Sequence, residues 1–390
     1  MSLKIAVAGD VSFRHPFATE KDYRVALQQI QPIFARADYR IVNLENPVAA
    51  QTDAPIPKNG PAIGCRAEDL IFLELLQCDC AILANNHMKD FGEKAVLRTC
   101  QALALRKIAY VGGGKNLAEA YLPVYVRQKD VTVALLAVCE NEFSVATEDG
   151  AGSAGYDLIR LREAILDAKE QADFVMILFH GGNEYCPFPS PQTIKRYRLL
   201  CDLGADAVVA MHTHCPQGWE IYRGKPILYS LGNFYFPLLE RMRPFSNWFE
   251  GYTAELTFTK GEPVTFIVHP YRFDAACTQI TPYTGAEREK IDGYYRRLCA
   301  IIAEEKDTNA LYDAWCVTHA YVATRLAQFD ETFWEGAQPQ ALYAIRNLFC
   351  CESHLELVRR SLQLMTAGGL VQAHAGEAEI LRLQMMDAGE

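Results

Sequence analysis

One stretch of the chain reads Phe174-Val175-Met176-Ile177-Leu178-Phe179-His180-Gly181-Gly182, an apolar run that ends abruptly in a histidine and two glycines. A short apolar run bounded by turn residues is consistent with a strand that is buried on both faces. The same arrangement recurs at residues 207–214, where an apolar run ends in His212-Thr213-His214. Both runs predict strands of an α/β sheet that carry polar residues where each strand ends.

Similar short apolar runs alternate with helical patterns over the first two thirds of the chain, as expected for stacked β-α units. Two later pairs of runs are joined by Arg223-Gly224-Lys225 and Lys260-Gly261-Glu262, which predict hairpins, so part of the sheet is antiparallel. The predicted strands span residues 4–8, 40–44, 80–84, 108–111, 131–138, 174–179, 207–210, 219–222, 227–230, 252–259 and 263–269. The predicted helices span residues 22–37, 67–76, 93–105, 158–171 and 191–203.

From about residue 285 onward the pattern is helical, with amphipathic segments at 289–305, 310–329, 340–349, 353–365 and 377–386. We therefore expect an α/β domain at 1–275 and an all-helical domain at 276–390. The helical part could cap a cleft, form a dimer contact or simply pack on the α/β part, and packing is the simplest of the three. His319 and His354 lie in it without ligand spacing, so we expect core or surface positions for them.

The composition excludes several classes of protein. Of 390 residues, 50% are hydrophobic and 22% charged, which is typical of a folded globular chain. The net charge of −10 argues against nucleic acid as the partner, and no apolar run approaches the roughly 18 residues of a membrane-spanning helix. The thirteen cysteines lack regular spacing and the first residues lack the features of a signal peptide, so we expect a cytoplasmic protein without a disulfide framework.

Nearly every predicted strand of the first part ends in a side chain that can bind a metal ion. Strands of an open α/β sheet share one edge at their carboxyl ends, where ligands usually bind. We therefore expect these side chains to converge on one pocket. They are Asp10, Asn43 with Glu45, Asn85-Asn86-His87, His180, and His212 with His214.

Carboxylates, amides and imidazoles without a thiolate suit Mn, Fe or Zn better than Mg or Ca. Taken singly, each motif has a simpler explanation: Gly9-Asp10 as a turn, Asn85-Asn86 as a helix N-cap, His180 as a buried histidine. Their joint occurrence at successive strand ends favours a metal site. Because Glu45 can bridge two ions, the pattern predicts a hydrolytic centre with two divalent metal ions.

Five motifs occur in a characteristic order, followed by a long block that ends at Gly232-Asn233-Phe234. They are Gly9-Asp10-Val11, Asn43-Leu44-Glu45, Ala84-Asn85-Asn86-His87, His180-Gly181-Gly182-Asn183-Glu184-Tyr185 and His212-Thr213-His214. With these motifs the sequence resembles the CapA family of capsule-synthesis (poly-γ-glutamate biosynthesis) proteins, within the calcineurin-like metallophosphoesterase superfamily. The resemblance covers residues 3 to 270, and the helical part lies outside it.

The resemblance implies a four-layer α/β/β/α sandwich with a dinuclear metal site at the sheet edge. It implies that His87 contacts the scissile phosphate or protonates its leaving group, and that Arg14 and Glu184 are candidates for substrate contact. The implied ligands of the first ion are Asp10, Glu45 and His214, and those of the second are Glu45, Asn86, His180 and His212.

The chain departs from the superfamily pattern at position 12, where Asp-x-His would place a histidine and Ser12 stands instead. The first ion would then be weakly held, or it would need His15 or water as a further ligand. Two functions follow from the resemblance. The first is a metal-dependent phosphoesterase acting on a small-molecule or polymer phosphoester, and the second is a non-hydrolytic, metal-binding component of capsule or polyglutamate synthesis.

Overall fold

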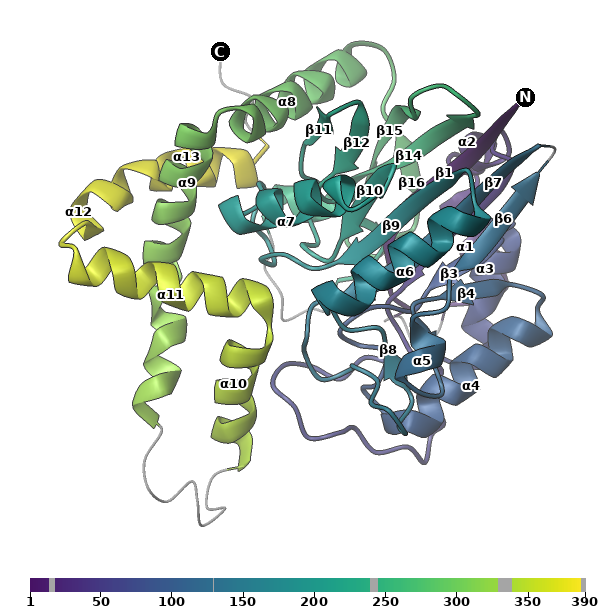
Figure 1. Ribbon diagram of the computed structural model, residues 1–390, viewed down its shortest axis with the longest axis horizontal. Coiled ribbons are helices and arrows are strands. Elements are labelled where there is room, and N and C mark those ends of the chain that lie inside the picture. The colour runs from purple at the N-terminus through teal and green to yellow at the C-terminus, as the bar shows by residue number, and fades with distance from the viewer. Residues whose placement is uncertain (14–17, 129, 239–244, 329–338, 387–390) are drawn as a thin grey trace.

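A computed structural model describes residues 1–13, 18–128, 130–238, 245–328 and 339–386 of the chain. Its α/β part contains two large sheets (Figure 1). The first sheet has the order β16 (Ile280–Pro282), β15 (Thr265–Phe273), β14 (Glu250–Thr259), β1 (Ser2–Val11), β2 (Tyr39–Leu44), β3 (Cys80–Ile82), β4 (Ala109–Val111), and β13 (Asn233–Tyr235) also pairs with β1. The second has the order β11 (Trp219–Tyr222), β12 (Lys225–Leu228), β10 (Ala207–Met211), β9 (Phe174–His180), β7 (Val131–Cys139), β6 (Val124–Gln128).

The two sheets pack face to face, and central strands such as β1, β9 and β10 are buried on both sides. In β1, Ile5 and Val7 belong to the core between the sheets, whereas Ala6 and Ala8 face the outer helices. In β9, Leu178 likewise faces the other sheet. This alternation explains why the strands read as continuous apolar runs in the sequence.

Helices cover both outer faces. The first sheet is covered by α1 (Glu20–Leu27), α2 (Gln31–Phe34), η1 (Ala67–Leu70), α3 (Ile71–Leu75) and α4 (Gly92–Leu105). The second is covered by α6 (Leu158–Gln171) and α7 (Pro191–Asp202), whose N-caps Asp157 and Ser190 accept hydrogen bonds from backbone N–H groups of the first turn. The predicted four-layer α/β/β/α sandwich is thus confirmed. The short elements β5 (Gly113–Gly114), β8 (Gly152–Ser153), α5 (Leu117–Ala120) and η2 (Ser246–Phe249) complete it.

The C-terminal region is helical, as predicted, and lies at one end of the sandwich (Figure 1). Its core residues, including Tyr294 and Trp315, belong to the same buried cluster as the space between the sheets. The division of the chain at residue 275 stays a prediction. The helices are α8 (Gly285–Ala303), α9 (Glu305–Thr318), η3 (Ala320–Gln328), α10 (Pro339–Cys350), α11 (Glu352–Thr366), α12 (Leu370–Ala373), η5 (His374–Gly376) and α13 (Glu377–Gln384).

Two predicted helices are wrong in their extent. The helix predicted at 22–37 divides into α1 and α2, because Pro32 has no N–H to donate back along a continuous helix. The helix predicted at 310–329 ends at Thr318, and a 3-10 segment follows. There the Thr318 hydroxyl donates to the carbonyl of Ala314, a side-chain bond that competes with regular helix geometry. Among the described helices, none has the length and apolar character needed to cross a bilayer.

Candidate metal centre

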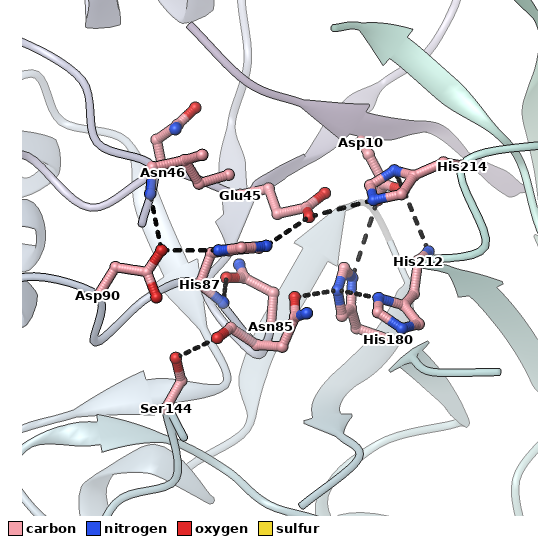
Figure 2. A network of polar contacts seen from close by, with 12 residues as sticks. Asp10, Glu45, Asn46, Asn85, His87, Asp90, Ser144, His180, His212 and His214 are labelled. Carbon is pink, nitrogen blue, oxygen red and sulfur yellow. Dashed lines mark hydrogen bonds and ion pairs between the residues drawn. The ribbon is translucent and has the colours of Figure 1, made fainter. Parts of the chain in front are cut away.

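Five strand ends meet at one place in the structure (Figure 2). We expected one sheet edge; instead, β1, β2 and β3 come from the first sheet, and β9 and β10 come from the second. Because the two sheets face each other, these side chains lie close together. In a single sheet, five adjacent strands would hold them farther apart. All seven predicted ligand and acid residues are buried there: Asp10, Glu45, Asn86, His87, His180, His212 and His214.

Asp10 is fixed by two hydrogen bonds. The side-chain amide of Asn43 donates to Oδ1 at 2.7 Å, and the backbone N–H of His212 donates to Oδ2 at 3.1 Å. Complete burial nevertheless raises the pKa of Asp10 to about 6, because these donors and the nearby His212 only partly offset desolvation. A buried carboxyl in this condition favours a bound cation.

Asp10, Glu45 and His214 present ligand atoms that all lie within 4.8 Å of one another. His214 Nδ1 lies 3.6 Å from Asp10 Oδ2, and its Nε2 lies 3.7 Å from Glu45 Oε1. Both separations exceed a hydrogen bond, so the three groups point at a common space rather than at each other. Two carboxylate oxygens and an imidazole nitrogen form a donor set that suits Mn, Fe or Zn.

His180 forms a second group beside the first. Its Nε2 lies 3.1 Å from Asn86 Oδ1 and 3.0 Å from His212 Nδ1, and its Nδ1 lies 3.1 Å from the side-chain nitrogen of Asn43. Burial lowers the pKa of His180 well below its usual value, and the neighbouring histidines lower it further. The ring is therefore neutral, which is the form that binds metal ions.

The backbone around these groups is unusual. His212 has a φ of +106° and His214 a φ of +56°, in a region that residues other than glycine seldom adopt. Asn233 braces the second of them, because its side-chain amide donates to the carbonyl of His214 at 3.1 Å and its Oδ1 lies 2.9 Å from His214 Nδ1. Such strain is typical of functional sites.

Gly9 permits the close approach of two chain segments at the base of the centre. A Cβ at this position would lie 1.9 Å from the carbonyl oxygen of Gly232. That same carbonyl accepts a hydrogen bond from the N–H of Asp10 at 3.2 Å. Glycine at position 9 is thus needed to hold Asp10 against the loop that precedes Asn233.

His87 lies between an acid and the centre. Its Nδ1 is 2.7 Å from Asp90 Oδ2, while its Nε2 is 3.9 Å from Glu45 Oε1. Lys58 forms a buried ion pair with Asp90, and its Nζ lies 3.2 Å from His87 Nδ1. Sequence reasoning missed Lys58, because it lies in a loop and belongs to no motif.

A cavity of about 290 Å³ opens beside the centre. Asn86, His87 and His212 line one side. The helical region supplies the other side, which includes His319 and His354, both partly exposed at the surface of the cavity. The sequence held no signal for this wall, because helical periodicity shows which face is apolar and not which turn meets a distant loop.

Two predicted residues remain without a tested role. Glu184 lines the cavity and is exposed, and its contact with substrate stays a prediction. Arg14 lies outside the described residues, as does His15. Ser12 is buried, and its hydroxyl has no hydrogen-bond partner within the described part of the chain.

With this geometry established, the chain can be compared with known proteins. A family model described as "Bacterial capsule synthesis protein PGA_cap" matches residues 4–238. The chain belongs to this family. The resemblance to CapA proteins expected from the strand-end motifs is thereby confirmed, and the helices beyond residue 238 lie outside the matched family region.

Two curated relatives share the name CapA. The chain is 30% identical over 245 residues to the "Capsule biosynthesis protein CapA" of Bacillus anthracis, covering 60% of this chain and 60% of that protein. It is 31% identical over 212 residues to the "PGA biosynthesis protein CapA" of Bacillus subtilis, covering 54% and 56%. The match therefore spans less than two thirds of the length of either relative.

Among solved structures, the chain is similar to a novel phosphatase of Mycoplasma pneumoniae. The identity is 14% and the TM-score 0.46, over 69% of this chain and 93% of that one.

Proposed function

We propose that this PGA_cap family member is a phosphoesterase that depends on two divalent metal ions. The observation that carries the proposal is the convergence of Asp10, Glu45 and His214, whose ligand atoms lie within 4.8 Å of one another in a buried site. A second donor group, made by His180, His212 and Asn86, lies directly beside it. Imidazoles next to buried carboxylates form a donor set that suits a pair of Mn, Fe or Zn ions.

In this proposal Asp10, Glu45 and His214 hold one ion, and Glu45 is shared with the second. His180, His212 and Asn86 complete the second set. When bound, such a pair of ions lowers the pKa of water and neutralises charge on the phosphoryl oxygens. Asn43 and Asn233 hold the ligands Asp10 and His214 in place through their hydrogen bonds.

His87 is the proposed acid for the leaving group. Asp90 lies at hydrogen-bond distance from Nδ1, which fixes the ring and directs Nε2 toward the centre. A histidine oriented in this way can deliver a proton from Nε2 to the departing oxygen, while Asp90 stabilises the charged ring. Lys58 forms a buried ion pair with Asp90 and so compensates the charge of this carboxylate behind the ring.

A second candidate function rests on the names of the relatives, which place them in capsule or PGA biosynthesis. The same centre would then bind a phosphorylated or polyglutamate ligand without hydrolysing it. The buried Ser12, at a position where a further ligand would be expected, favours this alternative because a weakly held ion catalyses poorly. A cytoplasmic location remains part of either proposal.

The test combines metal content with turnover. Protein purified without chelators is analysed by elemental mass spectrometry and then assayed with phosphate monoesters and diesters in Mn, Fe and Zn. His212→Ala removes a proposed ligand, and His374→Ala, an exposed histidine on the helical region, serves as the matched control.

We expect near two equivalents of metal, and a loss of turnover of about 10³-fold or more in His212→Ala with an unchanged circular dichroism spectrum. His374→Ala should retain full activity. Unaltered turnover in both His212→Ala and Asn86→Ala would refute the proposal. Full metal content without turnover on any ester, combined with binding of γ-linked glutamate chains, would support the second candidate instead.

A further inference from the structure

The cavity beside the centre has a second wall that comes from outside the matched family region. The match ends at residue 238, whereas this wall is built from the end of α9 and from η3, α10 and α11. Its lining residues include Trp315, His319, Tyr321, Arg325 and His354. A group attached to a phosphate at the centre would extend toward this wall.

Hydrogen bonds join the wall to the loops that surround the centre. Gln340 donates to the carbonyl of Lys58 at 3.1 Å, in the loop after β2. Asn347 donates to Glu142 at 3.0 Å, in the segment after β7. Gln384 of α13 donates to the carbonyl of Tyr185, after β9, at 3.2 Å.

Glu352 adds a further connection, because its carboxylate accepts from the backbone N–H of Asn141 at 2.9 Å. These contacts reach three separate strand-end loops. The helices are therefore positioned as part of the site and are not merely packed on the sandwich, and the cavity is shaped before any ligand enters.

The wall offers one flat face and one cation. The rings of Trp315 and His319 stack with centroids 3.8 Å apart and 23° between their planes. Arg325 lines the cavity and has neither an ion pair nor a hydrogen bond within the described residues. The other cationic side chain there, the ammonium group of Lys58, is already paired with Asp90.

A guanidinium that lines a cavity and has no acidic partner among the described residues favours an anion, since it offers several donors in a fork that matches carboxylate or phosphate. Two carboxylates also line the cavity. Glu142 accepts the hydrogen bond from Asn347, Glu184 is exposed to solvent, and neither forms an ion pair with Arg325.

We propose that Arg325 binds a second anionic group of the substrate, so that the ester is anionic at both ends. The reacting phosphate would lie at the centre, and the leaving group would carry a carboxylate or a further phosphate to the helical wall. This inference rests on the proposed phosphoesterase function. A cavity of about 290 Å³ is at the lower end of ligand sites, which restricts the substrate to a small ester or the terminal unit of a chain.

The experiment compares wild type with Arg325→Ala, Arg325→Lys and the control Arg296→Ala, an exposed arginine of α8 that lies away from the cavity. Three esters are used: phosphoglycolate with its carboxylate, propanediol bisphosphate, and glycerol 1-phosphate with a neutral leaving group. We expect Arg325→Ala to raise KM for the doubly anionic esters by about tenfold, with KM for glycerol 1-phosphate within twofold. Arg325→Lys should recover part of the loss.

The ester with the larger change in KM identifies the natural group as carboxylate or phosphate. An equal effect on all three esters, or no effect on any, would overturn the inference. Calorimetry with phosphonoacetate and methylphosphonate, which cannot be hydrolysed as esters, separates the two proposals. Suppose that turnover is absent but that wild type binds phosphonoacetate tenfold more tightly than the Arg325→Ala variant does. The proposed phosphoesterase function is then refuted, whereas the proposed anion site at Arg325 is supported. If neither turnover nor this difference in phosphonoacetate affinity is observed, both proposals are refuted.

Discussion

The two sides of the cavity are built in different ways. On the sandwich side, the side chains stand at strand ends, are buried, and are each held by a neighbour such as Asn43 or Asn233. On the helical side the residues are partly exposed, with Tyr321 at 64%, and Arg325 has no partner among the described residues. Buried groups held in place by their neighbours suit chemistry that any substrate shares, whereas partly exposed groups on an added wall suit the choice of substrate.

The largest expected effect tests the rigidity of the sandwich side. Gly9→Ala places a methyl group 1.9 Å from the carbonyl oxygen of Gly232, so β1 and the loop before Asn233 must separate. We expect the free energy of unfolding to fall by about 3 kcal/mol or more, together with loss of bound metal. Urea denaturation and elemental analysis measure the two effects.

Gly293→Ala is the matched control on the helical side. Gly293 lies within α8, and its nearest neighbour beyond the helix backbone is Arg296 at 3.7 Å. Helix propensity predicts that alanine stabilises this position by up to about 1 kcal/mol. If Gly9→Ala and Gly293→Ala changed the free energy of unfolding equally, the close approach of β1 to the Gly232 loop would not limit stability.

Much of the sandwich side was accessible from sequence. Apolar runs that end in ligand-type residues, such as 174–180, gave both the strands and the candidate ligands. The facing of two sheets was not contained in that pattern and entered only through the family resemblance. Periodicity fixes which face of a strand is buried but not which sheet the strand joins.

The helical side could not be predicted to the same degree. Trp315 and His354 have the spacing of ordinary amphipathic helices, and nothing local shows that one end of each helix meets the centre. The strands β6, β13 and β16 were also missed. β13 and β16 have only three residues each, whereas β6 contains two valines and a tyrosine and its sequence does favour a strand. Contacts between elements far apart in sequence decide these features.

A smaller effect is expected for His87→Ala, and its dependence on the leaving group distinguishes a catalytic role from a role in substrate selection. His87→Ala removes the proposed acid on the sandwich side, so esters with poor leaving groups should suffer most. We expect turnover of an alkyl phosphate to fall by about 10²-fold, and that of 4-nitrophenyl phosphate by much less, because nitrophenolate leaves without a proton. Steady-state kinetics with both esters measure the difference.

His354→Ala provides the comparison from the opposite wall, since His354 lines the same cavity. It should change the two esters by the same factor. If instead His354→Ala reproduced the leaving-group dependence of His87→Ala, the assignment of the acid to the sandwich side would be wrong.

The smallest effect concerns the attachment of the helical side. The Glu356 carboxylate on α11 accepts a hydrogen bond from the hydroxyl of Ser190, the N-cap of α7, at 2.6 Å. Burial raises the pKa of Glu356 from 4.5 to about 7, although Ser190 and Arg196 oppose the shift. Since the folded chain then holds this proton more tightly than the unfolded chain, stability should fall as pH rises from 4.5 to 7.

Glu356→Gln should remove that part of the pH dependence, which amounts to at most about 3 kcal/mol. Urea denaturation at pH 5, 6, 7 and 8 measures it, with Glu289→Gln, an exposed residue of α8, as control. Parallel curves for wild type and Glu356→Gln would mean that the carboxylate is ionised throughout. A flatter curve for Glu356→Gln would mean that the helical wall is held less firmly above pH 7 than below it, because α11 is joined to the N-cap of α7 through this carboxyl group, whereas α6 and α7 pack on their own sheet through apolar residues.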